Sequence, residues 1–230
     1  MRVRVGTSGF SYSGWKGSFY PDKLAGSQML AYYAGRLAAV EINNTFYKTP
    51  SREMLESWAS KVPSSFRFAF KASRYFGSRR GMTDAKAPLE RLFGALEATK
   101  DKLGPVLVQL PLKKDVALLR DFVAALPPRR RVTLDLKHPS WRSDEVYDVL
   151  RARDVALCVA EQGSEPLEIV CTASWGYFRL RKDRYGKRAL DGWETRLRAL
   201  KLEEAYVFFK HDETGNAAKL ALSFQGRFSS

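Results

Sequence analysis

Four side chains in this sequence are suited to acid/base chemistry: Glu41, Lys71, Asp135 and Lys137. A positioned carboxylate can remove a proton from a substrate, and a nearby ammonium group stabilises the negative charge that then develops. We therefore predict that these residues are catalytic. Glu41 or Asp135 would be the general base, and Lys71 or Lys137 would be its electrostatic partner.

A second group of polar and aromatic residues is predicted to bind the ligand. Arg179 and Arg181 are prominent in it, because guanidinium groups bind phosphate and carboxylate groups through paired hydrogen bonds. The candidate residues include more cations than carboxylates, so the expected ligand is an anionic molecule that carries a phosphate or a carboxylate. The predicted ligand-binding residues are Ser8, Tyr12, Trp15, Asn43, Asn44, Tyr47, Gln109, His138, Trp141, Arg179, Arg181, Lys210 and Asp212.

Most of the charged candidates lie in segments where apolar and polar residues alternate, which is typical of strands with one buried face. These segments are 40–43, 66–71, 107–110, 132–137 and 177–181. If helices cover the apolar faces, then Val40, Ile42, Phe68 and Phe70 point outward and the polar residues share an interior. In an open sheet with helices on both sides, central strands should instead be apolar on both faces.

Strand-like and helix-like segments alternate along the whole sequence, which predicts an α/β fold with a single domain over residues 1–230. Strands are expected at 2–6, 40–46, 66–71, 106–110, 131–137, 156–160, 177–181 and 205–210. Helices are expected at 51–58, 89–103, 116–126, 144–153 and 189–202. The polar inner faces favour a TIM-like (β/α) barrel with a closed or nearly closed parallel sheet. Active sites in such barrels lie at the carboxyl ends of the strands, where the candidate residues are expected to meet.

Composition places few restrictions on function. The chain has 230 residues, 45% apolar and 28% charged, which suffices for one core. Its first residues are predicted to form a strand rather than a leader peptide. No apolar run approaches the ~20 residues of a membrane span. We therefore expect a soluble cytoplasmic protein with no membrane partner. Cys158 and Cys171 are predicted to be small buried residues, and neither a disulfide framework nor a cysteine-rich metal site is expected.

The charge balance is strongly basic, with 39 Lys and Arg against 25 Asp and Glu and a formal charge of +14. This excess favours anionic partners and gathers at 74–80, 129–131 and 179–188. The arginines at 129–131 follow two prolines and precede a strand, so they are expected in an exposed loop at the far end of the barrel.

Several candidates have a structural alternative. Glu41 could be a buried carboxylate that pairs with Lys71, and Asp135 and Lys137 could form a local pair. His138 and His211 are the two histidines of the sequence, which disfavours a zinc or iron site, and a carboxylate magnesium site is a minor alternative. We predict no metal and no cofactor. His211 and Asp212 could be a solvated pair in a loop.

An aromatic, glycine-containing segment follows the first predicted strand. It contains Phe10, Tyr12, Trp15, Phe19 and Tyr20. Such a composition suits a lid or a platform that stacks on bases or sugars, and equally a hydrophobic plug over one barrel end. The neighbouring Gly6-Thr7-Ser8-Gly9 lacks the lysine of a P-loop and the spacing of a dinucleotide fingerprint.

At several of these motifs the chain resembles the DUF72 family, also called YecE-like proteins. The motifs are Gly6 to Tyr12 with Trp15 and Phe19-Tyr20-Pro21, Val40 to Tyr47, Phe68 to Ser73, Leu103 to Pro111, His138 to Trp141, and Tyr206 to Phe209 with Gly215 to Ala218. The resemblance implies a TIM-barrel-like fold and no established reaction. The chain departs from the family pattern at Asp135 and Lys137, where Glu and Arg are common, at Arg181, where His is common, and at Lys210-His211, where an Asn pair is common.

Two function classes follow from these observations. The first is an enzyme, for instance a hydrolase, that acts on an anionic substrate at the carboxyl ends of the strands. The second is a nucleic-acid-binding protein or nuclease that uses the basic segment 179–188 and the aromatic loop. Charges that point inward at strand ends favour the enzyme, and the oligomeric state stays open.

Overall fold

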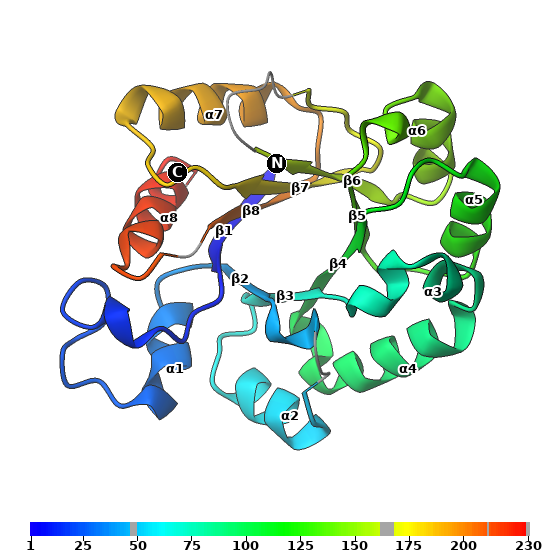
Figure 1. Cartoon of the computed structure of the whole chain (residues 1–230). Coiled ribbons are helices and arrows are strands. Elements are labelled where there is room, and N and C mark those ends of the chain that lie inside the picture. The colour runs from blue at the N-terminus through cyan, green and yellow to red at the C-terminus, as the bar shows by residue number, and fades with distance from the viewer. Residues whose placement is uncertain (47–49, 162–167, 211, 229–230) are drawn as a thin grey trace.

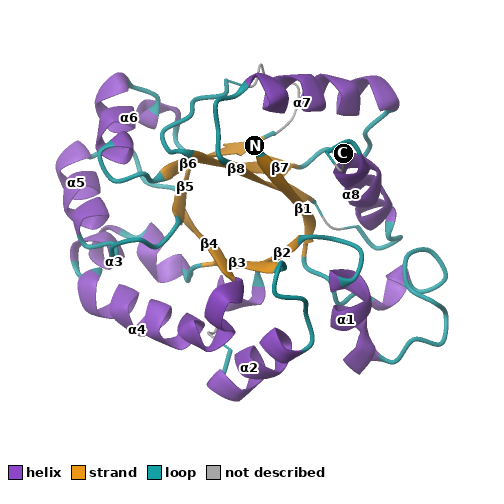
Figure 2. Cartoon of the chain, turned by 180° about the vertical axis from the view of Figure 1, so that it is seen from behind, coloured by secondary structure: helices purple, strands orange, loops and turns teal. Residues whose placement is uncertain are grey.

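The computed structural model describes residues 1–46, 50–161, 168–210 and 212–228. Within these residues, eight parallel strands form a closed barrel in chain order (Figures 1 and 2). The strands are β1 (Arg2–Ser8), β2 (Ala39–Ile42), β3 (Arg67–Lys71), β4 (Leu103–Leu110), β5 (Val132–Leu136), β6 (Ala156–Ala160), β7 (Trp175–Leu180) and β8 (Glu204–Phe209). This confirms the predicted TIM-like fold and the approximate position of each predicted strand.

Eight α-helices in the described part of the chain surround this barrel (Figure 2). They are α1 (Met29–Ala34), α2 (Arg52–Ser60), α3 (Arg79–Thr83), α4 (Lys86–Leu96), α5 (Val116–Ala124), α6 (Asp144–Arg151), α7 (Lys187–Ala199) and α8 (Asn216–Gly226). Each of the five predicted helices is present, but the one expected at 89–103 is α4 followed by a 3-10 turn, Glu97–Lys102, and Leu103 already begins β4. Helices α1, α3 and α8 were not predicted.

The second strand is shorter than predicted. It ends at Ile42, and a 3-10 turn, Asn44–Phe46, follows. The Thr45 hydroxyl lies 3.1 Å from the carbonyl oxygen of Ile42 and 2.6 Å from that of Lys71, so it ties this turn to the end of β3. The turn therefore brings Asn43 and Asn44 beside the strand ends instead of continuing the sheet.

Two separate apolar cores stabilise the barrel. The outer core lies between the strands and the helices and includes Val40, Ile42, Phe68 and Phe70, as the alternating pattern predicted. Full burial of one such side chain contributes about 1.5–3 kcal/mol. The inner core fills the middle of the barrel with side chains that include Leu107, Tyr177 and Phe208. Gly6 lies where β1 approaches β2, because a Cβ at this position would come within 1.9 Å of the Ala39 carbonyl oxygen.

Charged side chains form a layer on each side of the inner core. The upper charged layer, at the carboxyl ends of the strands, consists of Glu41, Lys71, Asp135, Lys137, Arg179 and Arg181. The lower charged layer, at the amino ends, consists of Arg4, Arg67, Arg131 and Glu204. The sheet register pairs Ser8 with Glu41, Gln109 with Asp135 and Ala160 with Arg179, which brings the upper candidates to one level.

The cysteines differ from the prediction in one respect. Cys158 is buried on β6, in the inner core, but Cys171 is exposed. Cys171 lies outside the strands, between β6 and β7. In the ranges that the structure describes, no helix combines the length and the apolar character needed to cross a membrane.

Candidate functional site

Glu41 lies at the centre of the upper charged layer and is completely buried. Its Oε1 accepts hydrogen bonds from Ser8 Oγ at 2.8 Å, Asn43 Nδ2 at 3.1 Å and Arg179 Nη2 at 2.9 Å. Its Oε2 accepts one from the Tyr177 hydroxyl at 2.7 Å. The ion-pair partner of Glu41 is therefore Arg179, and not Lys71 as the sequence suggested.

These partners keep Glu41 ionised. Burial by itself raises the pKa of a carboxyl group, but the Arg179 charge and the hydrogen bonds from Tyr177, Ser8 and Asn43 outweigh it, and the pKa of Glu41 is lowered. A carboxylate that is sealed from solvent and engaged by four donors is poorly placed to exchange protons with a substrate. Its geometry suits it to hold Arg179 in position.

Asp135 is the second carboxylate of the layer, and its contacts are one-sided. Its Oδ2 forms ion pairs with Lys137 Nζ at 2.8 Å and with Arg179 Nη1 at 3.5 Å. The same oxygen accepts a hydrogen bond from Gln109 Nε2 at 2.8 Å. Among the described residues, no hydrogen bond is made to Asp135 Oδ1. Asp135 and Lys137 do form the local pair that their spacing suggested, and Arg179 bridges Asp135 to Glu41.

Two cations of the layer have no carboxylate within ion-pair distance in the described part of the chain: Lys71 and Arg181. Lys71 Nζ lies 4.0 Å from the centre of the Phe46 ring. Burial and then the nearby Arg179 charge lower the pKa of Lys71, and the same two causes lower the pKa of Arg181. The upper charged layer thus holds four cations against two carboxylates.

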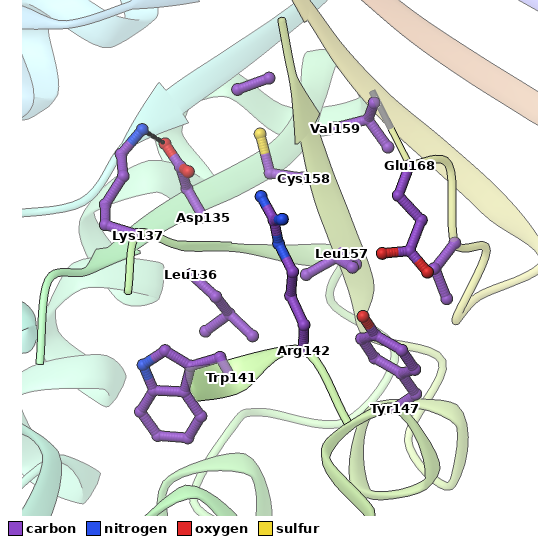
Figure 3. Close-up of a pocket in the computed structure, with 12 residues that line it drawn as sticks. Asp135, Leu136, Lys137, Trp141, Arg142, Tyr147, Leu157, Cys158, Val159 and Glu168 are labelled. Carbon is purple, nitrogen blue, oxygen red and sulfur yellow. Dashed lines mark ion pairs between the residues drawn. The ribbon is translucent and has the colours of Figure 1, made fainter. Parts of the chain in front are cut away.

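A pocket of about 140 Å³ opens beside Asp135 and Lys137 (Figure 3). It lies over the ends of β5 and β6, and the side chains of Trp141, Arg142 and Glu168 contribute to its lining. Figure 3 shows the Arg142 side chain extending into it. Of the predicted catalytic residues, Asp135 and Lys137 line this pocket, whereas Glu41 and Lys71 do not, because Glu41 lies below in the sealed interior and Lys71 stands over Phe46.

Some predicted ligand-binding residues have structural contacts instead. Trp15 is fully buried and its Nε1 donates to the carbonyl oxygen of Asp212 at 2.7 Å. The Asp212 carboxylate accepts backbone N–H groups at the start of α8, including that of Ala217 at 2.7 Å. The His138 Nδ1 accepts the Ser140 N–H at 3.1 Å in a 3-10 turn. These contacts fix loops at the upper end of the barrel.

The other predicted residues fall into three groups. Ser8 and Asn43 contact Glu41. The Tyr12 hydroxyl donates to the Ser8 carbonyl oxygen at 2.8 Å. Burial, and then the charge of Glu41, raise the pKa of Tyr12 to about 12. Asn44 lines a separate hollow of about 440 Å³ with Phe10. Trp141 lines the pocket beside Asp135 and Lys137, and its Nε1 donates to the Leu112 carbonyl oxygen at 2.6 Å. Lys210 pairs with Asp183 at 2.9 Å instead of meeting the layer. Tyr47 and His211 lie outside the described residues.

The aromatic segment after β1 packs on itself. Trp15, Phe19 and Tyr20 are buried, and the Trp15 and Phe19 rings meet edge to face with centroids 5.7 Å apart. All three rings belong to the outer core, where Phe19 meets the rings of Tyr32 and Tyr33 on α1, so the segment packs beside this helix. These three rings are not accessible for stacking on a ligand.

Three residues that the structure places at the site were not predicted: Tyr177, Arg142 and Glu168. Tyr177 precedes Arg179 by two residues, so strand alternation could have shown that it points inward too. Arg142 and Glu168 lie outside the strands, and nothing in their spacing marks them as neighbours of Asp135. In the ranges that the structure describes, no group of three or more His, Cys, Asp or Glu side chains is placed to share a metal ion.

Comparison with known proteins agrees with this architecture. Residues 4–230 match the family described as protein of unknown function DUF72. The crystal structure of a DUF72 family protein from Thermotoga maritima superimposes with a TM-score of 0.86 and 27% identity, over 100% of both chains. A DUF72 family protein from Enterococcus faecalis has a TM-score of 0.79 at 18% identity, over 99% of this chain and 96% of that one. A search of curated proteins finds no match. The chain belongs to the DUF72 family.

Proposed function

We propose that the upper charged layer binds an anionic substrate and performs acid/base catalysis on it. The observation that carries this proposal is the unbalanced charge of the layer: Lys71 and Arg181 face it without carboxylate partners in the described residues. Cations that are partly withdrawn from water cost free energy unless an opposite charge neutralises them. A phosphate or carboxylate group of the substrate would supply that charge.

The pair formed by Asp135 and Lys137 is the acid/base group that borders the pocket in this proposal, although the Asp135 side chain itself is only 5% exposed. All three donors to Asp135 contact Oδ2, which leaves Oδ1 to take a proton from a substrate in the adjacent pocket. Lys137 and Arg179 hold the carboxylate in place, and positive charge nearby stabilises the anion that proton removal creates. Lys71, with its lowered pKa, is suited to return a proton.

For Glu41 we propose a role other than that of general base. It contacts Arg179 and no solvent, so we assign it as a positioning residue that orients the Arg179 guanidinium towards Asp135. Arg179 Nε is buried and, among the described residues, has no hydrogen-bond partner. That donor is available to a substrate oxygen or an ordered water inside the barrel.

Ligand binding tests the first half of the proposal. A panel of phosphorylated and carboxylated metabolites would be screened by thermal shift, and the Kd of each hit measured by calorimetry. Lys71→Met and Arg181→Gln should each weaken binding about tenfold or more, because each removes a charged hydrogen bond. The matched controls are Lys201→Met and Arg184→Gln, which remove exposed cations elsewhere. Equal affinity of all variants would contradict the site.

Turnover tests the second half. Asp135→Asn keeps the shape of the side chain but removes its basicity, so it should retain ligand binding and lose at least about 100-fold in rate, which is the usual contribution of a general base. If wild type and Asp135→Asn converted a ligand from the screen equally fast, Asp135 would not be the general base.

Nucleic-acid binding is the second candidate function, and one observation favours it. Arg184, Lys187 and Arg188 are exposed around the start of α7, and none has an ion-pair partner in the described part of the chain. If they contact phosphates, affinity for a fluorescent single strand should fall with salt, and the triple alanine variant should flatten the log-log slope by ~1 unit per lost contact. Absence of binding at low salt, or an unchanged slope, would exclude this surface.

A further inference from the structure

A second hollow, of about 380 Å³, lies at the opposite end of the barrel, over the amino ends of the strands. Arginines dominate its lining and outnumber the carboxylates by six to two. The six are Arg2, Arg4, Arg67, Arg129, Arg130 and Arg131, and the two carboxylates are Asp101 and Glu204. The loop that was expected to expose arginines 129–131 at the far end of the barrel therefore forms one wall of a cavity.

Both carboxylates of this hollow are already engaged. Glu204 is buried and pairs with Arg4 and Arg131, and the Tyr206 hydroxyl lies 3.2 Å from its Oε2. Asp101 pairs with Lys102 at 3.2 Å. These contacts leave no carboxylate of the lining to neutralise the other arginines.

Three of the arginines have no ion pair in the described residues: Arg2, Arg67 and Arg129. Arg67 Nη1 donates to the carbonyl oxygens of Ser64 at 2.7 Å and Phe66 at 2.8 Å, which satisfies hydrogen bonds without cancelling charge. Burial and then the adjacent Arg4 lower the pKa of Arg67, which shows that like charges oppose one another here. Arg130 contacts Glu97 at 2.6 Å.

We propose that this arginine pocket binds the diphosphate group of a small molecule. The surplus of four positive charges matches a group that carries three or four negative ones, and guanidinium groups bind phosphate oxygens in pairs. The hollow falls within the ~300–1,000 Å³ range of small-molecule sites. Glu204 already has two arginine partners, Arg4 and Arg131, so the other arginines of the lining are not needed to neutralise it.

This site is independent of the one proposed for catalysis. The inner core, with Leu107, Tyr177 and Phe208, fills the barrel between the two charged layers. The ligand of the arginine pocket would enter from the amino ends of the strands, where Arg2 and Arg129 are exposed. Failure of the catalytic proposal would leave this one intact, and the reverse also holds.

Calorimetry with inorganic pyrophosphate at low salt tests the proposal. The variant is Arg2→Gln with Arg129→Asn, which removes two exposed and unpaired arginines; asparagine suits the positive φ of 60° at residue 129. Its Kd for pyrophosphate should rise at least about tenfold. The matched control, Arg184→Gln with Arg188→Gln, loses the same net charge just before and at the start of α7 and should bind as wild type does.

Two ligands distinguish free diphosphate from the diphosphate of a nucleotide. If ADP binds as tightly as pyrophosphate, or more tightly, and the pocket variant weakens both, then the diphosphate is the recognised group and the proposal stands. Lack of pyrophosphate binding by wild type would overturn it. Equal weakening by the pocket variant and the α7 control would also overturn it, because the effect would then be general electrostatics.

Discussion

Glu41 at the carboxyl ends of the strands and Glu204 at their amino ends are both buried glutamates held by arginines, but their surroundings differ. Glu41 is sealed by four donors, and the cations of its layer include two lysines: Lys137, which pairs with Asp135, and Lys71, which has no ion pair among the described residues. Around Glu204 the surplus cations are arginines that open onto a hollow. Arginine stays protonated in proteins, whereas lysine can release its proton when its pKa is lowered. The upper charged layer is therefore suited to proton transfer, and the lower one to anion binding alone.

The largest effect is expected from breaking the ion pair of Glu41. Arg179→Met would leave Glu41 buried with hydrogen bonds but without a counter-charge, which costs about 3–5 kcal/mol in the free energy of unfolding. Urea denaturation would measure this loss, with Arg184→Met as a control on an exposed arginine. If Arg179→Met lost no more stability than Arg184→Met, the burial of Glu41 would not distinguish the upper charged layer from the lower one.

Glu41→Gln would show how the upper pair depends on pH. The folded-state pKa of Glu41 is lowered, so its ionised form contributes stability above the unfolded value of about 4.3, and this contribution is lost as pH falls through the folded-state value. At pH 7 the free energy of unfolding of wild type should exceed that of the variant by about 1.5–3 kcal/mol, the range for hydrogen bonds to a charged group. The difference should narrow below pH ~4. A difference that stayed constant down to acid pH would rule out the ion pair as its source.

A smaller effect is expected at the amino ends. Arg131→Met removes one of the two arginines that hold Glu204, but Arg4 remains and the Arg131 side chain is 36% exposed. The free energy of unfolding should fall by about 1–2 kcal/mol, less than for Arg179→Met. Chemical denaturation of both variants in one buffer gives the comparison directly. A larger loss for Arg131→Met would reverse our ranking of the two layers.

The smallest effect concerns the unpaired Lys71. Its folded-state pKa is lowered, so the unfolded chain holds its proton more tightly and wild-type stability should rise with pH towards the ordinary lysine value of about 10.4. Lys71→Met lacks this pH-dependent contribution. The free energy of unfolding of wild type should therefore rise relative to that of Lys71→Met between pH 7 and pH 10. Unfolding of wild type, Lys71→Met and Lys201→Met at both pH values would detect the gain. Lys201→Met keeps Lys71, so its stability should follow that of wild type. If wild type gained as much over Lys201→Met as over Lys71→Met, the effect would belong to the net charge of the protein and not to Lys71.

Alternation along β2, β3 and β5 was enough to predict the barrel and the inward direction of Glu41, Lys71 and Asp135, because side-chain direction in a strand depends on position alone. Helices α1 and α3 escaped prediction because they are short and follow loops that carry little periodic signal. The pair of Asp135 and Lys137 was also foreseeable, since both residues lie on one strand end.

Partners across the barrel could not be read from the sequence. Glu41 and Arg179 are 138 residues apart, and Lys71 was the more obvious partner because its strand neighbours that of Glu41. The identity of the partner depends on how the closed sheet staggers β2 against β7, which is a property of the whole barrel. The sequence by itself determined the fold class, the outward apolar faces and the basic charge. The tertiary structure decided which carboxylate is sealed, which cations lack a partner and where those cations form a cavity, because burial and charge balance arise only when distant strands meet.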